Sequence, residues 1–458
     1  MTTISKLNIK VRRFEPSIAA VNITEDSAAL NFSERYGGAL LYCHTQQIWY
    51  VWNGIYWRQE GTGLVFEQTR QLIRELTADQ SLTVQQKCNK TSFVAGVEKF
   101  SRSDRQFAVQ ATAWDADPFL LGTPAGTVDL KTGEVLPPNP AHRITRITGC
   151  EPTNTSDCPL WHNFLWEATG GDTDLITFLQ QWCGYCLTGA TQEHALVFVH
   201  GGGGNGKSVF MNTVAGILGT YSTTAAMTTF TASRVDQHPT ELARLAGARM
   251  VTASETEKGH AWAEARIKSI TGGDEVAARF MRQDFFQFRP QFKLIIIGNH
   301  KPVLHNVDDA ARRRFNIVPF VRKPESPDPY LEQKLKPEWP TILRWMIEGC
   351  LSWQRHGLMR PASVTATTEA YFSDQDVMGQ WLAEHCDAEV GNPFKCDYVA
   401  ALFESWVEFC DAAGEKSGTK KAFSEALSQR GFVPKRGTGG ARMFAGLRLK
   451  KQGGGFDD

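Results

Sequence analysis

The stretch ALVFVHGGGGNGKSVFMNT, residues 195–213, decides the fold of this 458-residue chain. It reads as an apolar strand, a glycine-rich loop and the start of a helix. Between Gly201 and Ser208 the loop fills the pattern G-x-x-x-x-G-K-[ST]. A glycine-rich loop that opens a helix points several backbone N–H groups at a phosphate. The stretch therefore predicts a nucleoside-triphosphate site, and its flanking strand and helix argue against a flexible turn with an exposed lysine.

This pattern predicts ATP and Mg²⁺ as cofactors. Lys207 is expected to reach the β- and γ-phosphates, and Ser208 is expected to ligate the metal. The residues expected to hold the nucleotide are Gly201, Gly202, Gly203, Gly204, Asn205, Gly206, Lys207, Ser208 and Val209.

Two further apolar strands end in polar residues. RMVTA (249–253) precedes Glu255 and Glu257, and FKLIIIGN (292–299) ends in Asn299. Strands separated by helical stretches predict a parallel α/β sheet with its site at the carboxyl ends. One glutamate is expected to hold the metal, with Glu255 preferred, and one to orient the attacking water; the amide of Asn299 is expected to contact the γ-phosphate or position that water. The alternatives are an acidic helix start and an ordinary turn residue.

Basic residues flank the third strand. Lys268, Arg279 and Arg282 lie on or near a predicted hairpin, in which EVAARFM pairs with FFQFRPQF, and are candidate DNA contacts. Arg313, with Arg314 as second choice, is a candidate for neutralising charge on the transferred phosphate of a neighbouring subunit. The alternatives are a solvated charged face and a salt-bridged helix end.

The overall composition is that of an ordinary globular protein. Hydrophobic residues make up 42% of the chain and charged residues 21%, with no net charge, which excludes a uniformly basic coat for nucleic acid. The N-terminus lacks an apolar signal core, and no apolar run is long enough for a membrane span. Ten cysteines are scattered, and Cys183 and Cys186 read as buried thiols. These features predict a cytoplasmic protein without a membrane partner.

Composition shifts divide the chain into five predicted parts. The N-terminal accessory α+β domain is expected to contain short strands at ALLYCH, IWYVW, YWRQ and LVFEQ, with a helical stretch after them. The parts are a lead-in (1–35), this accessory domain (36–159), an ATPase domain (160–325), a helical lid or linker (326–390) and a winged helix (391–451).

The C-terminal part concentrates positive charge. Residues 416–451 contain ten lysines and arginines against one acid. Two helical stretches followed by a glycine-tipped strand pair predict a winged helix that binds DNA, and a basic packing domain is the alternative. The candidate DNA contacts here are Lys420, Lys421, Arg436 and Arg442.

The combined motifs resemble those of superfamily-3 helicases, in particular the phage/plasmid primase-type branch that includes poxvirus primase-helicases. The resemblance covers roughly residues 36–320 and rests on NGKS, SETEKG, GGD-x-x-x-A-R, IIIGNHKP and RRRFNIVPF, together with WYVWNGIYW and GTVDLKTGE. Many members carry adjacent acids at the second strand end, whereas Ser254 precedes Glu255 here. The lead-in is too short for a primase domain, so no priming activity is predicted.

The resemblance implies a P-loop AAA+ core that assembles into a ring, expected to be hexameric, and hydrolyses ATP at subunit interfaces. It implies an ATP-dependent DNA helicase of a phage, plasmid or other mobile element, with single-stranded or forked DNA and a separate primase or polymerase as partners. The alternative function is a nucleotide-controlled DNA-binding assembly or remodelling factor, such as a replication initiator or defence ATPase, that does not unwind. A small-molecule kinase fits less well, because it leaves the basic C-terminal part without a role.

Overall fold

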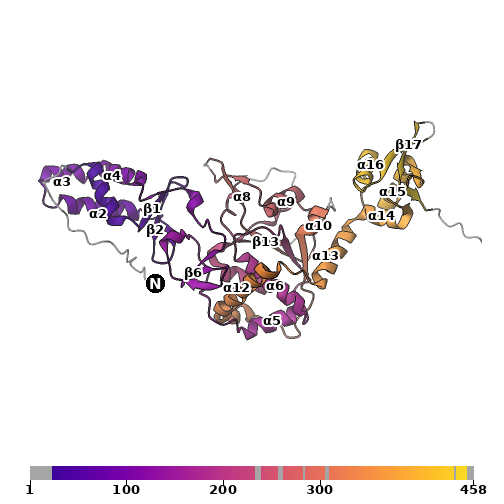
Figure 1. Cartoon of the computed structure of the whole chain (residues 1–458), viewed down its shortest axis with the longest axis horizontal. Helices are drawn as coiled ribbons and strands as arrows, with labels where there is room; N and C mark the ends of the chain where they lie inside the picture. The colour runs from indigo at the N-terminus through magenta and orange to yellow at the C-terminus, as the bar shows by residue number, and fades with distance from the viewer. Residues whose placement is uncertain are drawn as a thin grey trace, which may run out of the picture. The chain divides into compact units, whose positions relative to one another are not determined.

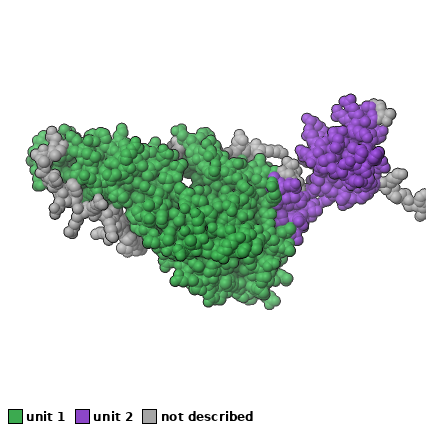
Figure 2. Space-filling model, in the orientation of Figure 1, with its two compact units in different colours: residues 1–302, 313–365 green, residues 303–312, 366–458 purple. Residues whose placement is uncertain are grey.

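The chain divides into two compact units (Figure 2). Unit 1 contains residues 1–302 and 313–365, and unit 2 contains residues 303–312 and 366–458. The computed structural model describes the backbone of residues 23–232, 239–255, 261–281, 284–304, 309–437 and 440–450. One unit boundary follows Pro302, and the other two fall within the helices α10 (Asp309–Arg314) and α13 (Ala362–Gln375).

The first part of unit 1 packs helices onto a sheet with the order β3-β2-β1-β4 (Figure 1). Strand β1 pairs antiparallel with β2 and parallel with β4. The rings of Trp49 and Trp57 belong to its core. The elements are α1 (Glu25–Tyr36), β1 (Leu40–Cys43), β2 (Ile48–Trp52), β3 (Trp57–Gln59), α2 (Leu64–Thr77), α3 (Leu82–Cys88), α4 (Thr91–Ser103) and β4 (Ala108–Val109).

Two stretches of this part differ from the expectation. Most of α1 lies in the predicted lead-in, where Thr24 caps the helix by accepting a hydrogen bond from the backbone N–H of Ser27 (3.1 Å). The stretch LVFEQ, predicted as a strand, begins α2 instead. Its apolar residue Val65 continues at helical spacing through Leu72 and Ile73, and these three side chains bury one face of the helix.

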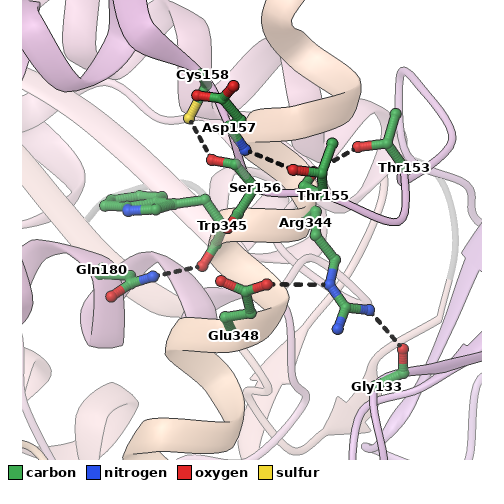
Figure 3. A network of polar contacts seen from close by, with 10 residues as sticks. All are labelled: Gly133, Thr153, Thr155, Ser156, Asp157, Cys158, Gln180, Arg344, Trp345 and Glu348. Atoms are coloured by element: carbon green, nitrogen blue, oxygen red, sulfur yellow. Dashed lines mark hydrogen bonds and ion pairs between the residues drawn. The ribbon is translucent and has the colours of Figure 1, made fainter.

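A pair of helices forms the base of unit 1. Helix α6 (Thr173–Cys186) packs against α12 (Trp339–His356), which the sequence places far away. A Cβ atom on Gly184 would lie 2.1 Å from the backbone nitrogen of Cys350, so only glycine permits this approach. Polar contacts extend the packing (Figure 3): Gln180 donates to the Trp345 carbonyl (3.0 Å), and Arg344 donates to the Gly133 carbonyl (3.1 Å).

The elements around this helix pair complete the base. A small antiparallel sheet has the order β5-β6-β7. The carboxylate of Glu338 accepts hydrogen bonds from the first N–H groups of α5, at Leu160 and Trp161. The elements are β5 (Leu120–Thr123), β6 (Gly126–Asp129), β7 (Glu134–Leu136), α5 (Pro159–Thr169) and α11 (Leu331–Leu335).

A five-stranded parallel sheet with the order β14-β8-β13-β10-β9 forms the centre of unit 1. This confirms the predicted parallel sheet, in which the strand leading to Asn299 lies between the other two predicted strands. Val197 and Val199 face the core shared with α5, α6, α7 and α12, whereas Phe198 packs against Trp262 on the other face. The strands are β8 (Leu196–His200), β9 (Ser222–Thr224), β10 (Met250–Glu255), β13 (Lys293–Gly298) and β14 (Phe315–Pro319).

Connections between these strands carry α7 (Lys207–Leu218), α8 (Pro239–Ala243), α9 (Glu264–Gly272) and a hairpin of β11 (Val276–Ala278) with β12 (Phe286–Phe288). The antiparallel pairing of β11 with β12 confirms the hairpin that the sequence predicts.

Unit 2 contains the predicted succession of two helices and a strand pair. Its apolar core begins at Val377, before the predicted boundary at residue 391, because Trp381 of α14 packs against Trp406 and Phe423. The sheets have the orders β15-β19 and β16-β18-β17. The elements are α14 (Val377–His385), β15 (Cys386–Ala388), β16 (Cys396–Tyr398), α15 (Val399–Ala413), α16 (Lys420–Gln429), β17 (Val433–Arg436), β18 (Arg442–Ala445) and β19 (Leu447–Leu449).

Lys293, at the amino end of β13, is buried without a carboxylate among its hydrogen-bond partners in the described residues. Its Nζ donates to the carbonyls of Thr188, Ala190 and Gln291 and lies 4.7 Å from the ring centroid of Tyr185. Burial lowers the pKa of Lys293 from 10.5 to about 7. The unfolded chain therefore binds one more proton than the folded chain between these two values.

Replacing Lys293 by methionine is expected to weaken the pH dependence of stability. In the wild type this lysine makes the free energy of unfolding rise as pH increases from about 7 towards 10, by up to about 1.4 kcal/mol per pH unit. Lys293→Met removes that contribution, which urea unfolding at pH 7, 8 and 9 measures. The exposed Lys87→Met serves as the control. An unchanged pH slope in Lys293→Met would contradict the burial of a neutral amine.

Candidate nucleotide site

The glycine-rich loop connects β8 to α7 at the carboxyl edge of the parallel sheet. Gly204 and Gly206 have φ angles of 76° and 84°, which disfavour any residue with a side chain. A Cβ atom on Gly201 would lie 1.9 Å from the carbonyl oxygen of Phe320, because the loop passes directly against the end of β14. Helix α7 begins at Lys207 without a side-chain cap. Its first N–H groups therefore stand at the loop as potential donors to an anion.

Lys207 is held inside its own loop. Its Nζ donates to the carbonyls of Gly201 (2.6 Å) and Gly202 (3.1 Å) and to Oδ1 of Asn205 (2.9 Å). The side-chain amide of Asn205 in turn donates to the Phe320 carbonyl. Burial lowers the pKa of Lys207. The sequence indicated Asn205 only as part of the motif, and the structure shows that it links the lysine to β14.

The loop borders a cavity of about 460 Å³, a size suited to a small ligand. This cavity brings the predicted residues Ser208 and Asn299 together from the loop and from the end of β13. Ser254, which sequence reasoning did not single out as a site residue, also lines it. The full lining is Gly203, Gly204, Asn205, Gly206, Lys207, Ser208, Val209, Ser254, Ile297, Gly298 and Asn299.

The ends of three strands lie level at this cavity. The backbone of Gly298 pairs with His200 on one side and with Glu255 on the other. The Glu255 side chain and the whole of Glu257 lie outside the described residues. Burial, followed by the positive charges of Lys301 and Lys207, lowers the pKa of His200. Lys207 and Lys301 therefore contribute positive charge near His200 at this edge of the sheet.

The two candidate arginines differ in their hydrogen bonds and exposure. Arg313 is exposed, and its carbonyl accepts a hydrogen bond from Arg360 (2.6 Å). Arg314 donates from Nε to Oγ1 of Thr271 (3.2 Å). Among the described residues that line the cavity, neither arginine is present. Both therefore lie outside the described lining of the cavity in their own chain.

The three basic residues proposed for the hairpin lie in different places. Lys268 lies on α9. The guanidinium carbon of Arg279 lies 4.8 Å from the ring centroid of Phe285, next to the β11–β12 pair. Arg282 lies outside the described residues.

The C-terminal candidates for DNA contacts lie in unit 2, at the start of one helix and on one strand pair. Lys420 and Lys421 open α16, where the helix dipole favours negative charge, and its first turn contains no acid. Arg436 pairs directly with Arg442 across β17 and β18. The directly opposed arginines are unfavourable by themselves. At the helix start, Lys421 lies 3.8 Å from Glu425, so its charge is partly offset.

Within the described residues, no group of three or more His, Cys, Asp or Glu side chains is arranged to hold a metal. None of the helices described is both long and apolar enough to cross a bilayer.

Two parts of the chain match known family models, and one solved structure shares the fold. Residues 29–170 match a family model described as "D5 N terminal like", and residues 199–314 match one described as "Family of unknown function (DUF5906)". The "C terminal region" of NrS-1 shares the fold, with a TM-score of 0.52 and 9% identity, over 92% of this chain and 98% of that one.

Viral proteins named as putative helicases and primases are similar in sequence. "Putative helicase L207/L206" of Acanthamoeba polyphaga mimivirus is 26% identical over 49% of this chain and 25% of its own length. "Putative primase C962R" of African swine fever virus is 25% identical over 59% of this chain and 31% of its own length. The chain thus spans a quarter to a third of these relatives. The two family-model matches and the viral relatives support a primase-helicase-like family for this chain.

Proposed function

We propose that this chain is an ATP-dependent DNA helicase of a phage, plasmid or other mobile element, which unwinds DNA during replication. The observation that supports this most is the meeting of Lys207, Ser208 and Asn299 at one cavity. That cavity lies at the carboxyl edge of a parallel sheet, in a chain similar to viral proteins named as helicases and primases.

The loop fits a triphosphate. A Cβ atom on Gly203 or Gly204, which line the cavity, would meet nothing within 4 Å, so this side of the loop is open. Lys207 is pre-positioned by carbonyl oxygens, and its charge supports binding of the β- and γ-phosphates. Ser208 and Glu255 are the residues proposed to hold Mg²⁺, which supplies charge neutralisation on the phosphates when bound.

Hydrolysis needs a group that orients the attacking water. Glu255 or Glu257 fills this role in our proposal, because β10 ends level with β13 beside the cavity. Asn299 lies between the loop strand β8 and the acidic strand β10, where its amide supports the γ-phosphate or the water. Because β13 lies between β8 and β10 in the sheet, residues that are far apart in the sequence can act on the same phosphate.

We further propose an AAA+ ring, a hexamer, with the site shared between subunits. Arg313 supports this because it is exposed and stands outside the described lining of its own cavity, as an arginine donated to a neighbour would. A head-to-tail contact of this kind forms a closed ring when the rotation fits.

Unit 2 is proposed to be a winged helix that binds DNA. Helix α16 carries Lys420 and Lys421 at its start, and the β17–β18 wing carries Arg436 opposite Arg442. A separate primase or polymerase is the proposed protein partner, since the viral relatives include a protein named as a primase.

Lys207→Ala is expected to lower ATP hydrolysis by at least about 100-fold and to abolish strand displacement on a forked duplex, because it removes a charge from the phosphate site. The exposed Lys99→Ala is the control and is expected to keep both activities. DNA-stimulated ATPase without any displacement by the wild type would instead support the assembly or remodelling factor.

The glycine-rich loop predicts that alanine substitutions at two neighbouring glycines differ in their effects on stability and nucleotide affinity. Gly201→Ala introduces a methyl group against the Phe320 carbonyl and is expected to cost about 1–3 kcal/mol of stability and at least about tenfold in nucleotide affinity. Gly202, although part of the motif, is not in the described lining of the cavity, so Gly202→Ala adds the same atoms into open space and should bind nucleotide like the wild type. Thermal melting measures the stability, and fluorescent-nucleotide titration measures the affinity. Equal behaviour of the two variants would argue against the close packing of the loop on the Phe320 carbonyl.

If Arg313 acts on a neighbouring subunit, two inactive variants should restore activity when mixed. An equimolar mixture of Lys207→Ala with Arg313→Ala pairs an intact lysine with an intact arginine at about a quarter of interfaces, so ATPase should recover to at most about that fraction. Mixing Lys207→Ala with the double variant should recover nothing. Failure of the first mixture to recover would remove Arg313 from the role, and Arg314 would be tested next.

A further inference from the structure

Helix α10, labelled in Figure 1, crosses one boundary between the two units. Arg312 is its last residue in unit 2, and Arg313 is its first residue in unit 1. The helical backbone holds neighbouring residues at a fixed spacing and orientation. Arg313, the candidate for acting on a neighbouring subunit, therefore follows any movement of Arg312.

Within unit 2, the stretch before Arg313 is tied to α13 by two contacts. The guanidinium carbon of Arg312 lies 5.1 Å from the ring centroid of Phe372, a cation–π distance, and this ring is almost fully buried. The backbone N–H of Leu304 donates to the side-chain carbonyl of Gln375 (3.2 Å). The position of Arg312 is therefore set by α13.

Asp376, which follows α13, joins this helix to α14 and α16. Its carboxylate forms an ion pair with two hydrogen bonds to Arg430, the residue after α16, and accepts a hydrogen bond from the N–H of Gly379 in α14 (2.9 Å). Burial opposes the charged form of Asp376, but the hydrogen bonds from Arg430 and Gly379, with the charges of Arg430 and Arg312, lower its pKa. The negative charge of Asp376 therefore acts on both arginines.

These contacts form a continuous chain from α16 to α10. Helix α16 begins at Lys420, a candidate DNA contact, and ends next to Arg430. Arg430 pairs with Asp376, Asp376 attracts Arg312, and Arg312 is bonded covalently to Arg313. Coupling between distant sites is carried by hydrogen-bond and packing networks of this kind when they connect elements with two arrangements.

We propose that Arg312 is a positioning residue for Arg313, through which DNA bound at α16 stimulates ATP hydrolysis. The inference rests on the proposed helicase function, in which Arg313 acts on the nucleotide of a neighbouring subunit. It adds the regulation of that site. DNA that fixes α16 fixes Arg430 and Asp376, and α10 then holds Arg313 in the orientation that stabilises the transferred phosphate. By linkage, DNA favours this arrangement only because it binds it more tightly than the alternative.

The experiment measures ATP hydrolysis by the full chain with and without a saturating forked duplex. The duplex is expected to stimulate the wild type at least about fivefold, and Arg312→Gln less than about twofold. The affinity of Arg312→Gln for the duplex and for a fluorescent nucleotide should equal that of the wild type, which a general loss of structure would not permit. Arg312→Lys keeps a cation over the Phe372 ring and should retain part of the stimulation. The exposed Arg355→Gln is the matched control and should retain all of it.

A double-variant cycle tests whether the contacts act in one chain. Asp376→Asn removes the charge but keeps an oxygen that can accept from Gly379, so α14 remains capped. If Asp376 acts through Arg312, the combined variant should lose no more stimulation than the stronger single variant. Additive losses would place the two residues in separate paths and overturn the chain of contacts. Full stimulation of Arg312→Gln would overturn the role of Arg312.

Failure of this inference and failure of the proposed function give different results. A wild type that displaces strands and whose DNA stimulation survives in Arg312→Gln would reject the positioning role alone. A wild type whose ATPase is stimulated through Arg312, but which displaces no strand, would reject the helicase proposal alone.

Discussion

The glycine-rich loop at the centre of unit 1 is folded around the buried ammonium group of Lys207. Burying an ammonium group is costly unless polar atoms surround it. Lys207 satisfies this requirement with two carbonyls of its own loop and with Asn205, whose amide is anchored on the Phe320 carbonyl. The loop must therefore stay tightly wound and stay against β14. Its glycines follow from that constraint, since a side chain at Gly201 would occupy the position of the anchoring carbonyl.

The same anchor explains why the sheet order matters. Strand β8 lies between β14, which holds the loop, and β13, which ends beside the cavity. Movement of either neighbour changes the loop, because both are hydrogen-bonded to β8 along its whole length. A rigid base resists such movement: α6 and α12 approach so closely at Gly184 and Gly349 that their backbones touch. In the proposed helicase, β13 and β14 are thus the elements that connect the loop directly to the rest of the sheet.

Local patterns were sufficient to predict some of these features. The strand–loop–helix around Lys207, the parallel sheet and the hairpin each depend on residues close in sequence, or on the general rule for strands joined by helices. The helix beginning at LVFEQ was missed because a short apolar run fits a strand equally well until its burial is known. The Asn205–Phe320 link, and the packing of Trp381 of α14 into the unit 2 core, join distant segments that no periodicity reveals.

The proposed contacts with nucleic acid differ in physical character between the two units. On unit 2, Lys420 and Lys421 lie at the start of a helix and Arg436 faces Arg442, so positive charge is concentrated there, although Glu425 lies 3.8 Å from Lys421. Such contacts read phosphates and weaken with salt. On unit 1, the hairpin candidate Arg279 is already in contact with a ring, since its guanidinium carbon lies 4.8 Å from the Phe285 centroid. A cation held over an aromatic ring is less available to a phosphate than a lysine at an exposed helix start, so the two sets of candidates are not equivalent.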